Sequence, residues 1–175
     1  MQDRASQVVA AAIRVLAAGG SRTLTHRAVD AEAHLPTGST SNVFRTRRAL
    51  VAAVVEAVLQ RDLLRLRSVD AAGLPTPGAV AAAFVAATLR EARQDVLARA
   101  ALLVDPDGEE LRRARDRFLL GGDGVPAGVT DPQVRRLVVV LVDGLLLDAV
   151  LCGASHDPGV IAASVDALVA GVARA

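Results

Sequence analysis

The feature that most restricts the fold is the run from Leu24 to Leu50, which divides into two short helical segments separated by a tight break. The first segment begins at Thr25, whose hydroxyl can accept a hydrogen bond from the amide of residue 27 or 28. His34 marks the break, because a sharp turn needs a left-handed residue and His is among the few besides Gly that adopt that conformation. The apolar residues of the first segment fall near one face: Leu24, Val29, Ala33 and Leu35.

The second segment, Thr37 to Phe44, is unlike an ordinary core helix. Most of its residues are small, polar and poor helix formers: Thr37, Gly38, Ser39, Thr40, Ser41 and Asn42. One interpretation is a solvated loop between two helices. The other is a helix that enters a DNA major groove, where Ser, Thr and Asn can contact base edges or phosphates. Phe44 closes the run with apolar bulk, and Arg45, Arg47 and Arg48 follow at once, which favours the second interpretation.

In order and spacing, this stretch resembles the DNA-binding domain of the TetR family of bacterial transcriptional repressors. The matching positions are Leu24, Thr25, Val29, Ala33, Leu35, Gly38, Ser39, Phe44, Arg47 and Leu50. The resemblance covers roughly the first third of the chain. It implies a domain of three helices, with a fourth helix leading out to a second helical domain.

The sequence departs from the family pattern at four positions. Asp30 stands where the family usually has Ala, His34 where it has Gly, and Pro36 where it has Ser. Ser41 stands where a Tyr commonly contacts a phosphate. The hydroxyl of Ser41 or the amide of Asn42 can replace part of that contact.

Composition predicts an all-α fold. The chain has 175 residues, of which 52% are hydrophobic, and this is ample for a core. Trp and Tyr are absent and Ile is rare, whereas Ala, Leu, Val and Arg dominate. All twenty basic residues are Arg, which fits either codon bias in a GC-rich genome or the use of guanidinium groups on phosphate.

Charge is divided unevenly along the chain. Residues 1–67 carry ten Arg and five acidic residues, a net charge of +5, whereas residues 68–175 carry ten Arg and fourteen acidic residues, a net charge of −4. The basic part contains the predicted helix-turn-helix. This asymmetry favours a polyanionic partner for the first part and argues against nucleic acid for the second.

The break at DAAGLPTPG, within residues 68–78, indicates a boundary between two domains. Before it, Ser6 to Ala18 forms an amphipathic helix that ends at Gly19-Gly20 and buries Val8, Val9, Ala12, Ile13 and Leu16. A long linking helix at residues 47–67 turns six residues inward: Leu50, Val51, Val54, Val55, Val58 and Leu59. We therefore expect a helix-turn-helix DNA-binding domain at residues 1–48 and a helical ligand-binding and dimerisation domain at residues 68–175.

In the second domain we expect helices at about 79–104, 109–120, 132–152 and 158–174. Asp105 or Asp107 can cap the second of these helices, and Asp131 with Pro132 starts the third after a loop at 121–132. The second carries Arg112, Arg113, Arg115 and Arg117. Acidic residues three or four positions away favour surface ion pairs over a nucleic-acid site there.

The last two helices are apolar nearly all round, so more than one of their sides must be covered. A second copy of the chain can supply that cover, and a deep core within one chain is the alternative. The resemblance favours the first reading, because TetR-like proteins usually dimerise through these helices. Asp143-Gly144-Leu145 is similar to a step often found there, and small residues such as Gly144, Ala149 and Gly153 permit close helix approach.

The leading hypothesis is a homodimeric repressor whose helix-turn-helix units read two half-sites of an operator about one helical turn apart. Base-edge or adjacent phosphate contacts are expected from Thr37, Ser39, Thr40 and Asn42. Backbone phosphate contacts are expected from Thr25, Arg27, Ser41, Arg45, Arg47 and Arg48. Phe44, Leu24, Val29 and Leu35 are expected to hold the motif together.

By resemblance, a small-molecule pocket in the second domain releases the repressor. Candidate lining residues are Phe84, Thr88, Leu89, Phe118 and residues near Leu146. An apolar or amphipathic ligand fits this lining better than a sugar or nucleotide, because the chain has no Trp or Tyr and few buried polar candidates.

Two rival functions are disfavoured. An enzyme is disfavoured because His26, His34 and His156 have no metal-ligand spacing, and no phosphate-binding Gly motif follows a strand, so no cofactor or metal is expected. A dimer that has lost operator binding is made conceivable by Pro36, Ser41 and Asp30, since an acid near DNA repels phosphate. The net charge of +3 across residues 20–50 argues against it.

The remaining signals concern location. Cys152 is the only cysteine, so no disulfide forms within the chain, and we expect a buried thiol in a reducing compartment. The N-terminal residues do not have the pattern of a secretory signal. The most apolar stretch, Leu137 to Leu151, is too short to span a membrane and contains Asp143 and Asp148. A cytoplasmic protein with no membrane partner is expected.

Overall fold

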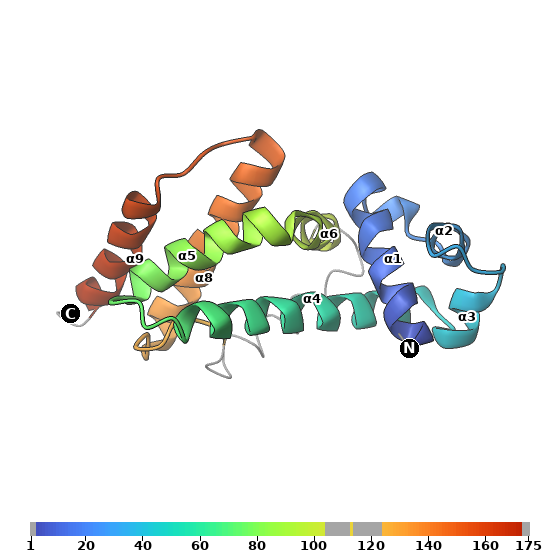
Figure 1. Cartoon of the computed structure of the whole chain (residues 1–175), viewed down its shortest axis with the longest axis horizontal. Helices are drawn as coiled ribbons and strands as arrows, with labels where there is room; N and C mark the ends of the chain where they lie inside the picture. Colours follow the sequence, from blue (N-terminus) through green and yellow to red (C-terminus); the bar gives the residue numbers. More distant parts are fainter. Residues whose placement is uncertain (1–2, 104–112, 114–123, 173–175) are drawn as a thin grey trace. The chain divides into compact units, whose positions relative to one another are not determined.

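The computed structural model describes residues 3–103, 113 and 124–172, and in these residues every regular element is a helix. The elements are α1 (Arg4–Gly19), η1 (Ser21–Thr23), α2 (His26–Glu32), α3 (Ser39–Val43), α4 (Arg47–Asp70), α5 (Pro77–Glu91), α6 (Arg93–Leu103), α8 (Pro132–Leu147), η3 (Asp148–Cys152) and α9 (Pro158–Val172) (Figure 1). The expected all-α class is confirmed.

The chain forms two compact units. The first comprises residues up to Leu59 together with α6 from Gln94, and the second comprises Gln60–Arg93 together with the later helices. These units differ from the domains that the sequence indicates, since α4 continues unbroken through residue 68 and the 68–78 segment lies inside the second unit.

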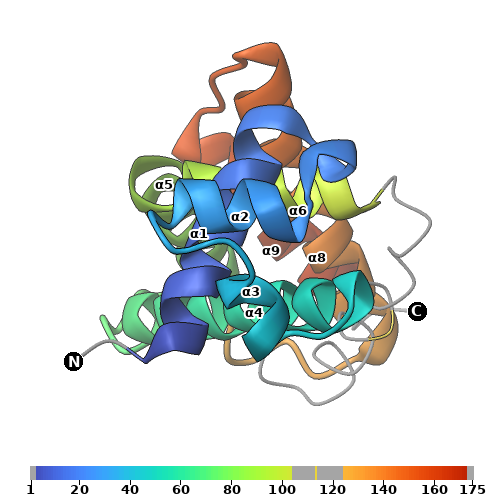
Figure 2. The same ribbon diagram turned by 90° about the vertical axis from the view of Figure 1, so that its right-hand side faces the viewer.

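The first unit is built on the apolar stripe of α1. All five residues expected inside are buried, as are all six on α4: Val8, Val9, Ala12, Ile13 and Leu16, then Leu50, Val51, Val54, Val55, Val58 and Leu59. Two polar contacts join α1 to α2 and its end. Gln7 Nε2 donates to the carbonyl of Ala33 at 3.1 Å, and Arg14 Nε donates to Glu32 Oε1 at 2.6 Å. Figure 2 shows α1, α2 and α3 gathered in this unit.

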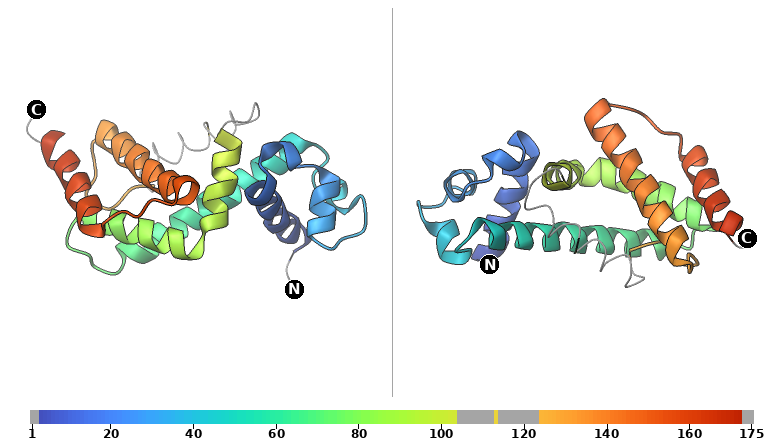
Figure 3. Two further views of the ribbon diagram at one scale, coloured as in Figure 1. Left: turned by 90° about the horizontal axis from the view of Figure 1, so that it is seen from above. Right: turned by 180° about the vertical axis from the view of Figure 1, so that it is seen from behind.

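The second unit packs α5 against α9 and α8 (Figure 3). Its core is formed by small and β-branched residues: Ala81, Val125, Val129, Val134, Val138 and Val165. The N-terminus of α5 is held closely. Thr76 Oγ1 accepts from the amide of Ala79 at 3.1 Å, and the amide of Gly78 donates to Asp166 Oδ1 on α9 at 2.8 Å.

Three features of the second half differ from expectation. The helix expected at 79–104 is two helices, because the backbone leaves helical geometry at Ala92 (φ −137°, ψ 28°). The helix from Pro132 ends as the π-helix η3, whose wider turns occupy the stretch expected to continue as α-helix. Cys152 at the end of η3 is exposed, so the expectation of a buried thiol is wrong.

One expected helix lies outside the described residues, except that Arg113 is helical. This is the helix at 109–120, and its caps Asp105 and Asp107 and the residue Phe118 also lie outside.

Gly78 allows the closest approach between α5 and α9. A Cβ atom built on it would lie 2.1 Å from the carbonyl oxygen of Ala162, which is backbone and cannot move aside as a side chain can. We expect Gly78→Ala to destabilise the second unit by about 1–3 kcal/mol, the usual cost of overpacking. Urea denaturation followed by circular dichroism measures this change.

Gly159→Ala is the matched control, because its added Cβ would meet only the end of the Asp157 side chain, at 3.0 Å. Equal stability of Gly78→Ala and the parent chain would show that α5 and α9 do not pack as closely as described.

Candidate nucleic-acid interface

The first half of the helix-turn-helix forms as its residues indicate. Thr25 caps α2, since its Oγ1 accepts from the amide of Ala28 at 3.1 Å. His34 adopts the left-handed conformation at φ 54°, and the amide of Leu35 donates to the carbonyl of Asp30 at 2.8 Å across the turn. Leu24 and Val29 are fully buried beneath the motif, whereas Leu35 and Phe44 are half-buried.

The second helix is shorter than the expected 37–44. It spans Ser39–Val43, and Thr37 belongs to the turn that precedes it. The physical reason is Gly38, which lies at φ 93° and so cannot be a helical residue. A helix of five residues makes few internal hydrogen bonds and depends on partners outside itself.

Asp30 on α2 supplies those partners. Its Oδ2 accepts from the amide of Gly38 at 2.7 Å, and its Oδ1 accepts from both the amide and the hydroxyl of Thr40, at 2.7 and 2.6 Å. The carboxylate thus satisfies amides at the N-terminus of α3 that the helix itself leaves unpaired. Asp30 is 3% exposed, so it points into the motif rather than toward a partner.

The same bonds keep Asp30 ionised. Burial acts to raise the pKa of the Asp30 carboxyl, but the hydrogen bonds from Thr40 and Gly38, with the positive field of His26, outweigh it, so this pKa lies below its ordinary value of 3.8. Because the folded-state pKa is lower than the unfolded one, the stabilisation is present above pH 3.8 and is lost as pH falls through the folded-state pKa.

Thr40 therefore does not read DNA. Its side chain is 0% exposed and its hydroxyl is committed to Asp30, so the expectation of a base-edge contact is wrong. A Thr in a run of Ser, Thr and Asn gives no local sign of facing inward. The departure at Asp30 was the available signal, because an acid on the inner face of α2 needs a donor opposite it.

The other polar side chains of the segment remain accessible. Thr37, Ser41 and Asn42 are exposed, and Ser39 is half-buried. The Ser39 hydroxyl donates to the carbonyl of Pro36 at 2.6 Å and that of Ser41 to the carbonyl of Gly38 at 2.9 Å, which leaves both oxygens able to accept a bond. Asn42 makes no such bond to any described residue.

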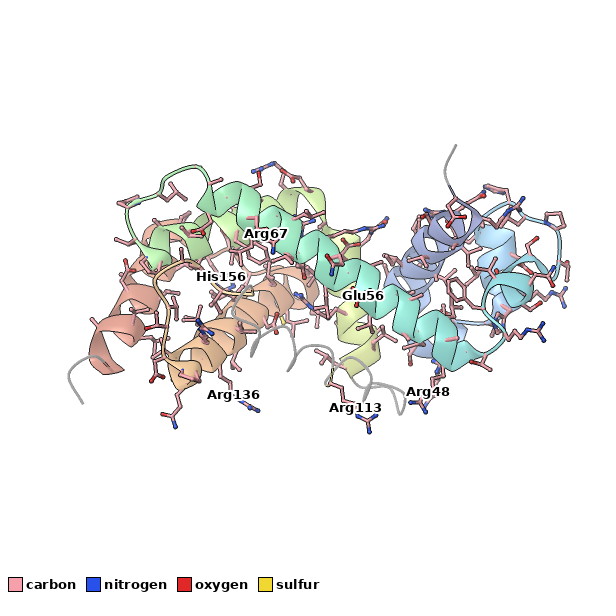
Figure 4. The ribbon with its side chains drawn as sticks, turned by 90° about the horizontal axis from the view of Figure 1, so that it is seen from below. Arg48, Glu56, Arg67, Arg113, Arg136 and His156 are labelled. Atoms are coloured by element: carbon pink, nitrogen blue, oxygen red, sulfur yellow. The ribbon has the colours of Figure 1, made fainter. Side chains whose placement is uncertain are left out.

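The basic side chains divide into two kinds. Arg27 and Arg45 are exposed and form no hydrogen bond or ion pair with the described residues. Arg47 is half-buried and its Nη2 donates to the carbonyl of Ser21 at 3.1 Å, so it also ties α4 to η1. Arg48 is exposed and extends outward from the first turn of α4 (Figure 4).

Sequence reasoning missed His26, whose Nε2 donates to the carbonyl of Phe44 at 2.8 Å and joins the two ends of the motif.

Comparison with known proteins identifies this architecture. No family model and no curated protein matches the sequence. The multidrug binding protein EbrR, in complex with imidazole, is 26% identical at a TM-score of 0.75, over 96% of this chain and 96% of that one. A member of the TetR family from Streptomyces coelicolor A3 is 26% identical at a TM-score of 0.75, over 95% of this chain and 98% of that one. In fold and in sequence, the chain is similar to TetR-family transcriptional regulators.

A solved structure of lower identity shares the fold. A transcriptional regulator from Rhodococcus sp. Rha1 is 23% identical at a TM-score of 0.72, over 97% of this chain and 96% of that one. The arrangement of helices in this chain is therefore shared by proteins of rather different sequence.

The residues expected to bind a ligand differ in burial. Thr88 and Leu146 are fully buried, Phe84 and Leu89 are half-buried, and Phe118 lies outside the described residues. Of the five, only Leu89 lines the cavity of about 410 Å³ between α5 and the segment that leads into α9. The hydroxyl of Thr88 has no hydrogen-bond partner among the described residues.

Metal-ligand clusters and membrane-spanning helices are absent from the described residues. No group of three or more His, Cys, Asp or Glu there is arranged to hold a metal ion. None of the described helices combines the length and apolarity needed to cross a membrane.

The role of Thr40 can be separated from base reading. We expect Thr40→Val to remove a hydrogen bond to a buried carboxylate and to destabilise the motif by about 1.5–3 kcal/mol. Because the loss acts through folding, DNA affinity should fall equally on all operator variants. Thermal unfolding and fluorescence anisotropy on a panel of operator variants measure both effects.

Thr40→Ser keeps the hydroxyl and is the control, so it should retain most of the stability. If Thr40→Val instead changed the preference among operator variants and left stability unchanged, Thr40 would be a base-reading residue and its inward role would be wrong.

Proposed function

We propose that the protein is a dimeric repressor that reads operator DNA with α3 and releases it when a small molecule binds the second unit. The observation that carries the proposal is the accessible polar face at residues 37–42, fixed from inside by Asp30 and flanked by exposed arginines. A helix anchored in this way presents its outer side chains in one orientation, which base recognition requires.

Asn42 is the principal base-reading residue in this proposal. Its amide is exposed, offers both a donor and an acceptor, and is not used by the fold. An Asn amide pairs in a bidentate manner with the N6 and N7 positions of adenine in the major groove. Thr37, Ser39 and Ser41 can contact neighbouring bases or phosphates through their hydroxyl oxygens.

Arg27 and Arg45 are the principal phosphate contacts, because both guanidinium groups are exposed and neither is engaged by the described fold. Arg48 is exposed as well, and Arg47 contributes charge while it holds Ser21. Thr25 caps α2 with its hydroxyl and stays exposed, so it can still donate to a phosphate.

The alternative of a dimer that has lost operator binding is weaker than the sequence indicated. It rested partly on the repulsion between Asp30 and phosphate, and Asp30 is buried with its charge satisfied by three donors. No specific feature of the described residues favours that alternative.

Base reading and phosphate contact give different signatures. We expect Arg45→Ala to weaken binding to all sequences and to reduce the slope of log affinity against log salt by roughly one unit. We expect Asn42→Ala to cost about 1–3 kcal/mol on the preferred operator and less on variants with the recognised base pair changed. Anisotropy titrations over a salt series and an operator panel measure both.

Arg67→Ala is the control for charge, since Arg67 lies on the last turn of α4, at the other end of that helix from Arg48 (Figure 4). An unchanged salt slope in Arg45→Ala would remove that phosphate contact, and an equal loss on every operator in Asn42→Ala would remove that base contact.

The dimer is proposed to form through α8 and α9. Large apolar side chains lie on their outer surfaces and on η3: Leu137 is 47% exposed, Val140 53%, Leu151 62% and Val160 64%. The exposed positions of α9 continue with small residues at helical spacing: Ala163, Ser164, Ala167 and Gly171. Gly144 on α8 is exposed, and a Cβ there would meet nothing within 4 Å. An apolar surface with small residues permits close packing of a second pair of helices.

A charge placed on this surface should prevent association. We expect Val140→Glu to shift the protein from twice the chain mass of 18.0 kDa to the single chain mass, because an unpaired carboxylate would be buried in the interface. Sedimentation equilibrium measures the mass. Leu64→Glu is the control, since Leu64 on α4 is 64% exposed but lies on neither α8 nor α9.

A parent chain that sediments as a monomer at micromolar concentration, or a Val140→Glu variant that remains dimeric, would contradict this interface.

A ligand-responsive protein is supported by similar structures. EbrR, at 25–28% identity, has been solved with ethidium, proflavin and malachite green as well as imidazole. A ligand that binds better to a conformation with misplaced α3 helices must lower operator affinity by linkage.

A further inference from the structure

The cavity of about 410 Å³ in the second unit has an apolar floor and a polar rim. One wall is a single stripe of α5, and the other is the segment that joins η3 to α9 together with the first turn of α9. Its floor is apolar, since Val85 and Ile161 are buried and Leu89 is half-buried beside them. Polar side chains lie at its rim: Arg90 from α5, and Ser155 and His156 from the joining segment. A molecule that fills this cavity must therefore have an apolar body and a polar head.

The charge of the rim indicates the sign of that head. No Asp or Glu lines this cavity in the part of the chain that the structure describes, whereas Arg90 does. Arg90 Nη2 donates to Glu91 Oε1 at 2.6 Å, but both side chains are mostly exposed, so this pair contributes little and leaves most of the guanidinium donors available.

The second rim group is His156, which lies on the segment between η3 and α9 (Figure 4). Its Nε2 is buried, lies 3.2 Å from Asp148 Oδ2, and makes no well-formed hydrogen bond to the described residues. The other acid nearby, Asp157, is already used: its Oδ1 accepts from the amide of Val160 at 3.0 Å and caps α9. Asp157 therefore serves the fold, whereas Arg90 and His156 line the cavity.

We propose that this cavity binds a small anionic amphiphile, with a carboxylate or similar head on Arg90 and His156 and an apolar tail along Val85, Leu89 and Ile161. The assignment rests on the proposed function, because it names the class of molecule that releases the operator. A guanidinium group binds a carboxylate through charge-assisted, often bidentate hydrogen bonds, and the apolar floor adds the hydrophobic contribution of the tail.

The test compares three molecules with the same tail: n-octanoate, n-octylamine and n-octanol. Isothermal titration calorimetry on the full chain should show that octanoate binds most tightly and octylamine most weakly. Arg90→Gln should reduce octanoate affinity roughly tenfold and leave octanol affinity unchanged. Ala86→Phe, which places a ring into the cavity from an exposed position of α5, should weaken octanoate and octanol alike.

Arg67→Gln is the control for loss of a positive charge outside the cavity, and it should bind all three molecules as the parent does. Equal affinity for octanoate and octylamine, or an Arg90→Gln variant that keeps octanoate affinity, would overturn the proposal. Tight binding of octylamine would reverse the assigned sign of the head.

Operator binding is measured separately by anisotropy without any amphiphile, so the two proposals can fail independently. An operator complex that octanoate dissociates in the parent but not in Arg90→Gln supports both. An operator complex combined with no preference among the three head groups overturns the ligand class alone. Octanoate binding of the expected selectivity without any operator complex would overturn the repressor and leave the cavity assignment in place.

Discussion

The buried carboxylate of Asp30 is the interaction on which the recognition element depends. A helix of five residues, opened by a glycine with positive φ, has almost no internal stability, and hydrogen bonds from Gly38 and Thr40 to one carboxylate hold its first turn. The cost of burying a charge is offset because three donors satisfy it. Asp30 thereby converts a segment with the composition of a loop into a fixed helix.

This arrangement divides the polar residues of the segment by function. One hydroxyl, on Thr40, is turned inward and stabilises the fold, while the side chains of Thr37, Ser41 and Asn42 stay outside and available. His26 and Arg47 also stabilise the fold, since each donates to a backbone carbonyl at an end of the motif. The residues that stabilise the motif and those proposed to give specificity are thus neighbours of similar polarity, and only their direction distinguishes them.

Features set by local physics were predictable from the sequence. The Thr25 and Asp131 caps, the left-handed turn at His34 and the buried stripe of α1 each follow from a few consecutive residues. Features set by distant partners were not. The inward turn of Thr40 depends on Asp30, the break at Ala92 has no Gly or Pro to announce it, and the exposure of Cys152 follows from where η3 ends. The cavity lining was missed for the same reason, since α5 meets residues 154–161 only in the fold.

The π-helical end of the α8 segment has a mechanical implication. In this π-helical turn the carbonyl of Val150 accepts from Arg93 Nη2 at 2.9 Å, and both residues belong to the second unit. The same stretch of chain runs on directly into the wall of the cavity at residue 154. One guanidinium group thus acts as a tether within the second unit: any displacement of Val150 must either move Arg93 with it or break that hydrogen bond.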